Sequence, residues 1–211
     1  MKKTAAIIVL LVFLVFSFES SAFASVIYSD IIFGATSKTG STENDLAGHM
    51  IGIDVPMNDY SKFIMEYSEL TVKSDNDATT TGLLIKSGLE LIENDTFQTY
   101  FNLSSFMIRG DSATLDATYY PILLGLEFRL NFSERTYING SYDHSICGKY
   151  KMDNSQSLQA DYGIASMKWN YRFNEHNGVA FGYHWSDLKL SQSVTTKTIN
   201  KGFSFGLTYQ F

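Results

Sequence analysis

The last residues of the chain place an apolar side chain at every second position. Phe203, Phe205, Leu207, Tyr209 and Phe211 alternate with small or polar residues. Successive side chains of a β-strand point to opposite faces of its sheet, so this segment predicts a strand with one apolar and one polar face. One such strand would also fit a soluble antiparallel sheet, so the rest of the chain has to decide the fold.

The same alternation recurs along most of the chain. It is present around residues 51–55, 63–67, 83–91, 97–104, 123–130, 164–173 and 179–186. Two further segments, about 26–36 and 137–147, are less regular. The chain is therefore predicted to consist of amphipathic strands throughout.

Two classes of polar connection alternate between these strands, and both are rich in residues that tolerate tight turns. Short turns begin near Met57, Glu93, Asn131 and Asn174. Longer loops are predicted at about 37–46, 74–80, 110–117, 148–157 and 190–198. Together these connections predict ten strands, with both termini on the same side.

The first residues have the composition of a secretory signal peptide rather than of a strand. Lys2 and Lys3 precede an apolar run, and Ala22-Phe23-Ala24 provides a small-x-small cleavage site. We therefore expect a signal peptide over residues 1–24 and one exported domain over residues 25–211. The full chain has a net charge of −6, and removal of this segment makes it more negative, which argues against a nucleic-acid partner.

Amphipathic strands of this number can form a soluble sandwich or a barrel whose apolar face meets lipid. The predicted export, the turn pattern and the aromatic residues at the ends of the apolar rows favour the barrel. Backbone polar groups must be paired within hydrocarbon, so the sheet has to close. We predict an all-β protein with a single antiparallel up-and-down transmembrane barrel of ten strands, eight being the alternative.

The C-terminal strand, Phe203, Phe205, Leu207, Tyr209 and Phe211, resembles that of the bacterial outer-membrane β-barrel proteins. In size and loop length the chain resembles their small opacity/outer-membrane-protein-X-like group, whose members often have eight strands. The resemblance implies the outer membrane of a Gram-negative cell as location. It also implies that the terminal strand is the signal read by the barrel-assembly machinery. It implies no chemistry.

The polar face of the predicted strands carries acids and bases at mid-strand. These are Glu66, Lys86, Glu90, Glu127, Arg129, Lys168 and Arg172. Unpaired charges are costly in a narrow lumen, so we expect these side chains to pair with one another and to fill it. The alternative is a small porin-like channel lined by the same charges.

Candidate catalytic residues are few. His184 and Ser186, with Asp187 next to them, resemble the His-x-Ser pair of the outer-membrane lipid A deacylases. The alternation directs this pair inward, away from lipid, and no Glu follows Glu175, so a lipid A-modifying hydrolase is only a distant alternative. Omptin-type proteases also have ten strands but carry acids and a His in large loops, for which we see no counterpart.

The spacing of His49, His144 and His176 predicts no metal site, and no motif indicates a cofactor. Exposed loops on a rigid scaffold are common binding positions. We expect a non-enzymatic outer-membrane protein with a structural or surface-interaction (adhesion) role. Its expected partners are outer-membrane lipid, lipopolysaccharide, the assembly machinery and a host or surface ligand bound through the loops.

Overall fold

The computed structural model describes residues 25–74, 77–111, 116–152, 158–191 and 196–211. The predicted signal peptide, residues 1–24, lies outside this part of the chain. Ten strands make up nearly all of it: β1 (Val26–Thr39), β2 (Thr42–Asn58), β3 (Ser61–Lys73), β4 (Ala78–Glu93), β5 (Phe97–Asp111), β6 (Asp116–Asn131), β7 (Thr136–Met152), β8 (Leu158–Arg172), β9 (Asn177–Ser191) and β10 (Thr196–Gln210).

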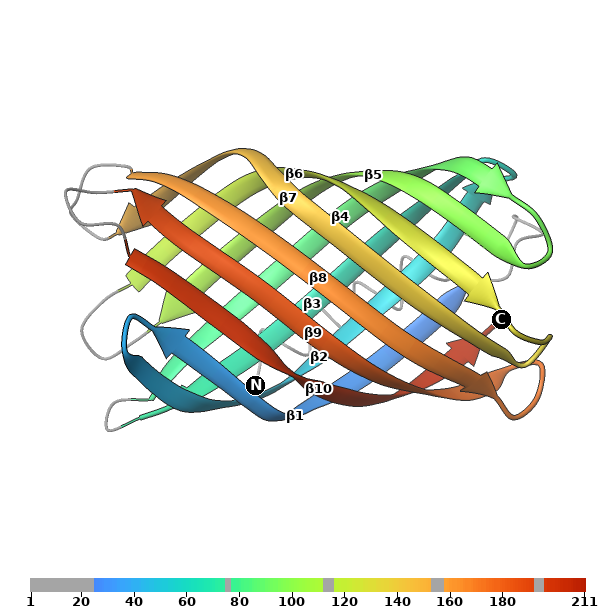
Figure 1. Cartoon of the computed structure of the whole chain (residues 1–211), viewed down its shortest axis with the longest axis horizontal. Coiled ribbons are helices and arrows are strands. Elements are labelled where there is room, and N and C mark those ends of the chain that lie inside the picture. The colour runs from blue at the N-terminus through green and yellow to red at the C-terminus, as the bar shows by residue number, and fades with distance from the viewer. Residues whose placement is uncertain (1–24, 75–76, 112–115, 153–157, 192–195) are drawn as a thin grey trace.

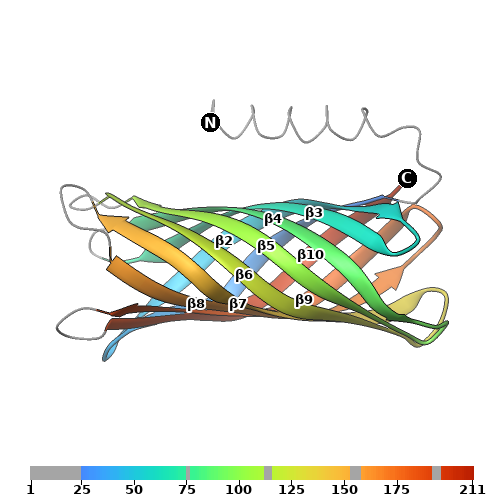
Figure 2. The same cartoon turned by 90° about the horizontal axis from the view of Figure 1, so that it is seen from above.

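The strands form a closed antiparallel barrel in which each strand pairs with its neighbours in sequence and β1 pairs with β10. The closing register joins Val26 to Gln210 and Thr39 to Thr198. Figures 1 and 2 show all strands inclined to the long axis, with the start of β1 and the end of β10 at the same end of the barrel. The predicted ten-stranded up-and-down barrel is confirmed.

The turns at the end that holds these termini are closed by side-chain oxygens, and we call it the short-turn end. Asn58 Oδ1 accepts the backbone N–H of Tyr60, and Asn94 Oδ1 accepts those of Thr96 and Phe97. Asn174 Oδ1 does the same for the N–H groups of residues 176 and 177. These contacts explain why Asn begins the turns, because its amide mimics a backbone turn.

The opposite end, which we call the loop end, differs from the prediction. The loop expected at 37–46 is wrong, because β1 and β2 continue to a tight turn at Gly40 and Ser41. The strands likewise take in 78–80, 110–111, 116–117, 148–152, 190–191 and 196–198. Strands of 13 to 17 residues exceed the roughly 9–11 residues that cross a bilayer, so the barrel wall itself extends into water.

The two irregular strands contain β-bulges. In β1 the register shifts between Phe33 and Thr36, where Gly34 has a φ of 54°. In β7 the register with β6 shifts between Cys147 and Ser145, so that Ile146 is the extra residue. An extra residue reverses the alternation beyond it, which is why the sequence pattern was weak in both segments.

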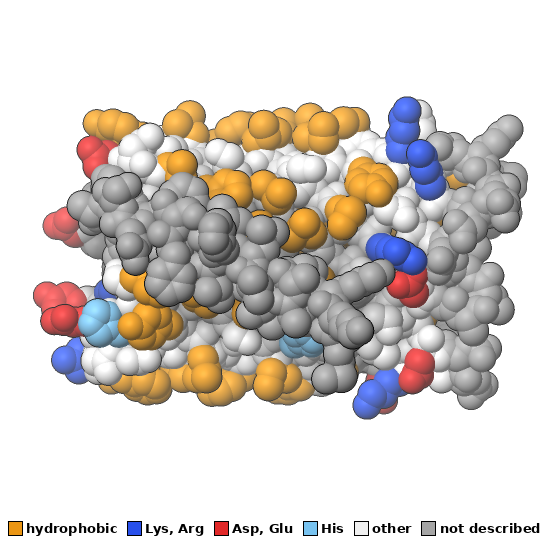
Figure 3. Space-filling view, turned by 180° about the vertical axis from the view of Figure 1, so that it is seen from behind, with side chains coloured by type: hydrophobic (Ala, Val, Ile, Leu, Met, Phe, Trp, Pro, Cys, Tyr) orange, Lys and Arg blue, Asp and Glu red, His pale blue; other side chains and the backbone are white. Residues whose placement is uncertain are grey.

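The outer wall carries a belt of exposed apolar side chains. Its members include Ile31, Ile85, Leu89, Phe101, Leu103, Leu126, Met167, Phe181, Phe205 and Leu207. Figure 3 shows apolar side chains as a band between charged side chains of both signs toward the two ends. A continuous apolar surface of this extent on a closed barrel is the surface that meets hydrocarbon. Within the described residues, no helix has the length and hydropathy needed to cross a bilayer.

We expect Gly34→Val to lower the free energy of unfolding by about 1–2 kcal/mol, because a β-branched residue is strained at a left-handed φ. Space is not the cause, since a Cβ at Gly34 would meet only Phe203 Cδ2, at 3.9 Å. Urea titration of the refolded barrel measures the change. Gly110→Val is the matched control, because Gly110 has no positive φ and its Cβ would meet nothing within 4 Å. Equal losses in both variants would contradict the assignment of strain to Gly34.

Candidate functional site

The interior of the barrel is the candidate site, and its lining changes character along the axis. Inward side chains in the short-turn half are mostly charged or amide-bearing. Those in the loop half are mostly aromatic and aliphatic. The lumen therefore has a charged layer and an apolar layer, whereas the sequence predicted charges alone.

Three inward lysines, of which Lys62 and Lys86 are buried, anchor the charged layer, and each is held by carboxylates from other strands. Lys86 of β4 lies 2.7 Å from Asp143 of β7. Lys62 of β3 forms an ion pair with Glu127 of β6 and lies 3.7 Å from Asp54 of β2. Lys168 of β8 pairs with Asp30 of β1. These pairs connect opposite parts of the wall across the lumen.

The other predicted lumen charges lie inside the barrel but find partners other than one another. Glu66 accepts a hydrogen bond of 2.7 Å from the Tyr28 hydroxyl. The Arg129 guanidinium lies 3.9 Å from the centroid of the Tyr137 ring and donates to Asn131 Oδ1 at 2.9 Å.

Two of the predicted residues lie near the short-turn end. Arg172 donates to Gln210 Oε1 at 3.1 Å and to the backbone carbonyl of Glu134. Glu90 lines a cavity at the same end. The expectation that the seven predicted charges pair mainly with one another is wrong, although all seven lie on the inner face.

Four partners were missed by the sequence reasoning: Asp30, Asp54, Lys62 and Asp143. Asp54 and Lys62 alternate with apolar neighbours, so the period-two signal was sufficient to include them. Asp30 and Asp143 lie in the two bulged strands, where the alternation is interrupted. Which acid meets which base depends on the closed-barrel register, which the sequence alone does not provide.

Glycines on neighbouring strands make room for the buried carboxylates. Asp30 is paired in register with Gly206, and Asp143 with Gly125. A Cβ at either glycine would overlap the Asp carboxylate beside it. The carboxylates can therefore lie flat against the wall and leave the centre of the lumen to the lysine side chains.

Two cavities border the charged layer among the described residues. The larger, about 170 Å³, lies at the centre and is bordered by Asp30, Glu66, Lys86, Asp143 and Lys168. The smaller, about 120 Å³, opens toward the short-turn end and is bordered by Lys62, Glu90 and Tyr100. Asp54, Glu127 and Arg129 border both cavities, so this layer of charges separates them.

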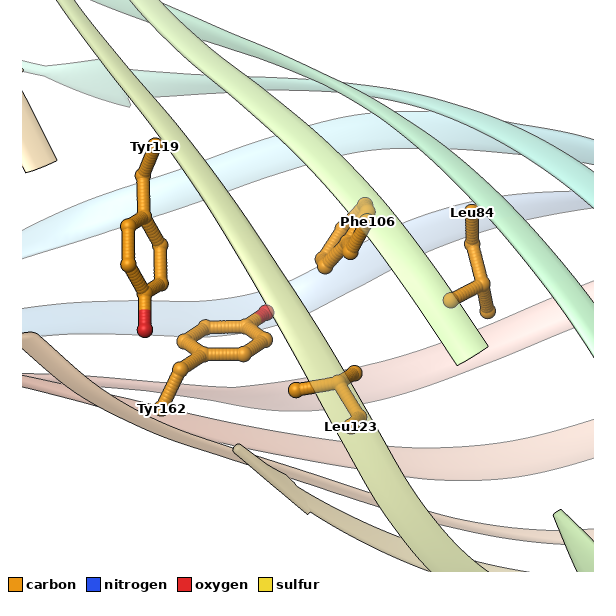
Figure 4. Packing of buried hydrophobic residues seen from close by; sticks show 5 residues of the cluster. All are labelled: Leu84, Phe106, Tyr119, Leu123 and Tyr162. Carbon is orange, nitrogen blue, oxygen red and sulfur yellow. The ribbon is translucent and has the colours of Figure 1, made fainter. Parts of the chain in front are cut away.

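The apolar layer consists of two clusters. The aromatic cluster contains Leu84, Phe106, Tyr119, Leu123 and Tyr162, and Figure 4 shows these side chains converging from β4, β5, β6 and β8. The aliphatic cluster contains Ile32, Ala35, Leu46 and Met50 from β1 and β2. Leu123 is 0% exposed and Tyr119 1% exposed, so the centre of the aromatic cluster is as inaccessible to solvent as a protein core.

The wall beside the aromatic cluster contains a gap in the β7–β8 ladder. The register is interrupted between His144 and Lys149 of β7. Ser145 Oγ accepts the Tyr162 N–H at 2.8 Å, and the Tyr119 hydroxyl donates to the Ala160 carbonyl at 3.0 Å. These side chains satisfy backbone groups of β8 that the ladder leaves open.

The predicted His-x-Ser pair points into the lumen. His184 Nε2 lies 2.9 Å from Ser204 Oγ, and Ser186 Oγ accepts from Asn200 Nδ2 at 3.5 Å. Asp187 is on the outer face, where it pairs with Lys197 at 3.0 Å. Asp187 is therefore not available as an acid to orient His184. The described residues contain no group of three or more His, Cys, Asp or Glu that could hold a metal ion.

The residues of the predicted assembly signal form the outward row of β10. Phe203, Phe205, Leu207 and Tyr209 are exposed on this row, and Phe211 follows the end of the strand. The structure does not test whether these residues are read by the assembly machinery, so that role stays a prediction.

Comparison with solved structures identifies the fold. The outer-membrane protease OmpT from Escherichia coli matches with a TM-score of 0.64 at 10% identity, over 91% of this chain and 98% of that chain. The translocator domain of the autotransporter NalP from Neisseria meningitidis matches with a TM-score of 0.48 at 14% identity, over 100% and 98% of the two chains. Ail from Yersinia pestis gives 0.39 at 14% identity, over 90% and 98%.

No protein-family model and no curated protein matches the sequence. The closed barrel and its outward apolar belt define the class of fold, which is that of the outer-membrane β-barrel proteins. Its fold is similar to the barrel of the Escherichia coli protease. That similarity concerns the backbone and transfers no catalytic residue.

The buried Lys86–Asp143 pair gives a prediction about stability. Side-chain exposures are 6% and 2%, so removing one partner leaves a buried charge without its counter-ion. We expect Lys86→Met and Asp143→Leu each to lower the free energy of unfolding by about 3–5 kcal/mol. The double variant should be more stable than either single variant, because no unpaired charge remains.

Urea unfolding of the four proteins tests this, and the Asp187–Lys197 pair on the outer face supplies the control. Asp187→Ala should cost less than about 1 kcal/mol, because the Lys197 side chain that it leaves behind is 48% exposed and stays hydrated. A double variant less stable than both single variants would contradict the account of the buried pair.

Proposed function

We propose that the protein is a non-enzymatic integral outer-membrane barrel whose lumen is closed, and that it has a structural or surface-interaction role. The observation that carries the proposal is the order of the two layers. Lysines held by carboxylates occupy one half of the lumen, and the aromatic and aliphatic clusters occupy the other. A solute would have to displace both layers.

The charged layer alone supports closure less strongly than the two layers together. Charges beside a cavity of about 170 Å³ could border a hydrated path, which is the channel alternative. The aromatic cluster adds a dry obstruction, since hydrophobic constrictions exclude water and ions. We therefore favour the closed barrel over the small channel.

The proposal assigns the short-turn end to the periplasm and the loop end to the outside. Supporting it, β1 begins and β10 ends at the short-turn end, as expected of a chain delivered from the periplasm. The terminal row of β10 would be read by the barrel-assembly machinery. Outer-membrane lipid, lipopolysaccharide and a host or surface ligand are the proposed partners at the loop end.

We expect the purified protein to show no steady conductance in planar bilayers, because ions meet paired charges and then an apolar layer. Lys86→Ala and Glu127→Ala should remain without steady conductance, since the aromatic cluster is intact in both. Asp187→Ala, on the outer wall, serves as the control. Steady wild-type currents that change size in Lys86→Ala or Glu127→Ala would overturn the closed lumen.

Surface interaction gives a second prediction. Replacing residues 40–41, 74–77, 112–115, 153–157 and 192–195 by Gly/Ser segments of equal length should reduce attachment of cells to a host or abiotic surface. Loops on a rigid scaffold carry most binding residues, so the scaffold itself should contribute little. The matched control replaces 94–96 and 132–135 at the short-turn end. Unchanged attachment after replacement of all five connections would exclude an adhesive role of the loops.

A further inference from the structure

One carboxylate of the lumen has no basic partner. Among the described residues, the central cavity is bordered by five acids and three bases: Asp30, Asp54, Glu66, Glu127, Asp143, Lys86, Arg129 and Lys168. Two of these acids have a lysine each, and Lys62 and Arg129 lie beside two others. No described lysine or arginine forms an ion pair with Glu66, so this carboxylate is left over.

A tyrosine reaches Glu66 across strand β2. In the barrel register Tyr28 of β1 is opposite Gly52 of β2, and Gly52 is opposite Glu66 of β3. The Tyr28 ring lies over Gly52, where a Cβ would come within 2.4 Å of the ring. Its hydroxyl donates to Glu66 Oε2 at 2.7 Å. No described side chain donates to Oε1, so half of the carboxylate remains open to the cavity.

Apolar side chains surround this carboxylate on the loop side of the cavity. Leu84 is directly opposite Glu66 in the register of β3 and β4. Leu84 belongs to the aromatic cluster (Figure 4), Ile164 packs against it, and both border the cavity. Met50 of the aliphatic cluster borders the cavity as well. Glu66 therefore lies where the charged layer meets the apolar layer, and a fitting partner is positive at one end and apolar at the other.

The cavity has room for such a partner and an approach that favours cations. Its volume of about 170 Å³ is roughly ten times the space that one water molecule requires. The smaller cavity toward the short-turn end is bordered by the acids Asp54, Asp59, Glu90 and Glu127 and by the bases Lys62 and Arg129. This excess of acids attracts cations from the short-turn end.

We propose that the central cavity is a dead-end site for a small primary alkylammonium compound, which enters from the short-turn end. The ammonium group pairs with Glu66 Oε1. The alkyl chain packs against Leu84, Ile164 and Met50. The inference goes beyond the closed barrel proposed above and rests on it only in that the two clusters close the cavity toward the loop end.

The chemistry of the cavity selects an organic cation over a metal ion. Calcium takes six to eight oxygen ligands and magnesium demands an octahedral set, whereas the described residues contain no group of three or more His, Cys, Asp or Glu that could hold a metal ion. The protein's own nearby ammonium group does not fill the role. Lys168 Nζ lies 4.5 Å from the centroid of the Tyr28 ring but pairs with Asp30.

The test measures binding of n-butylammonium to the full chain in detergent micelles by isothermal titration calorimetry. We expect saturable binding to the wild type with a Kd of roughly 1 mM or tighter. The neutral molecule n-butanol, of the same size, should bind at least about tenfold more weakly, because it cannot form a hydrogen bond between two charged groups. Binding of n-butylammonium no tighter than that of n-butanol would overturn the site.

The variant Glu66→Gln should weaken binding of n-butylammonium by about tenfold. It keeps an acceptor for the Tyr28 hydroxyl, and heat-modified gel mobility verifies that it is folded. Glu69→Gln is the matched control, because Glu69 lies on the outer face of the same strand and accepts from the Tyr67 hydroxyl at 3.1 Å. It loses the same charge and should change binding less than about twofold. Equal weakening in the two variants would contradict the proposal.

A measurement that leaves Glu66 intact locates the ligand. Ser166→Cys, in a Cys147→Ser background, places a thiol at the border of the central cavity. At ten times its Kd, n-butylammonium should slow modification of this thiol by a small methanethiosulfonate about tenfold, as mass action requires of a nearly filled site. An unchanged rate would exclude the central cavity as the binding site. Neither readout depends on conductance or attachment, so failure here is distinguishable from failure of the closed-lumen function.

Discussion

Closure of the backbone hydrogen-bond ladder is the constraint on which the rest of the structure depends. Strands that face the hydrocarbon of a bilayer on one side have no water there to form hydrogen bonds with their N–H and C=O groups. Ten strands solve this by pairing β1 with β10. Where the β7–β8 ladder fails, Ser145 and Tyr119 supply the missing partners. The bulge at Gly34 is accommodated by a left-handed φ at a residue without a Cβ.

Closure also creates the interior, and the interior has to be filled or hydrated. Near the short-turn end it is lined by lysines, and the carboxylate partners of Lys86 and Lys168 lie over glycines of the neighbouring strand. Toward the loop end it is filled by the aromatic and aliphatic clusters. Buried ion pairs add little stability by themselves. Their more important effect here is that no lumen lysine among Lys62, Lys86 and Lys168 remains free to attract a permeant anion.

The number of strands and the face on which most side chains lie could be predicted from the sequence. In a strand with one lipid-facing and one lumen-facing side, apolar and polar residues alternate with a period of two. Phe205 and Ser204, or Leu126 and Glu127, lie on the faces that the alternation predicts. The strand ends were not predictable, since wall that projects into water is polar on both faces. Residues such as Lys38 and Asp45 therefore resemble loop residues. The carboxylate partners of the lumen lysines, Asp30 and Asp143, were not predicted because bulges interrupt the alternation in β1 and β7.

The claim that alternate residues meet lipid and an enclosed hydrated interior can be measured directly. Spin labels at Leu126→Cys, which is outward, and Ser166→Cys, which borders the central cavity, are compared in a Cys147→Ser background in bilayers. The account predicts that collisions with dissolved oxygen dominate at position 126 and that a water-soluble nickel complex is relatively more accessible at position 166. Equal accessibility profiles at the two positions, or the reverse order, would contradict it.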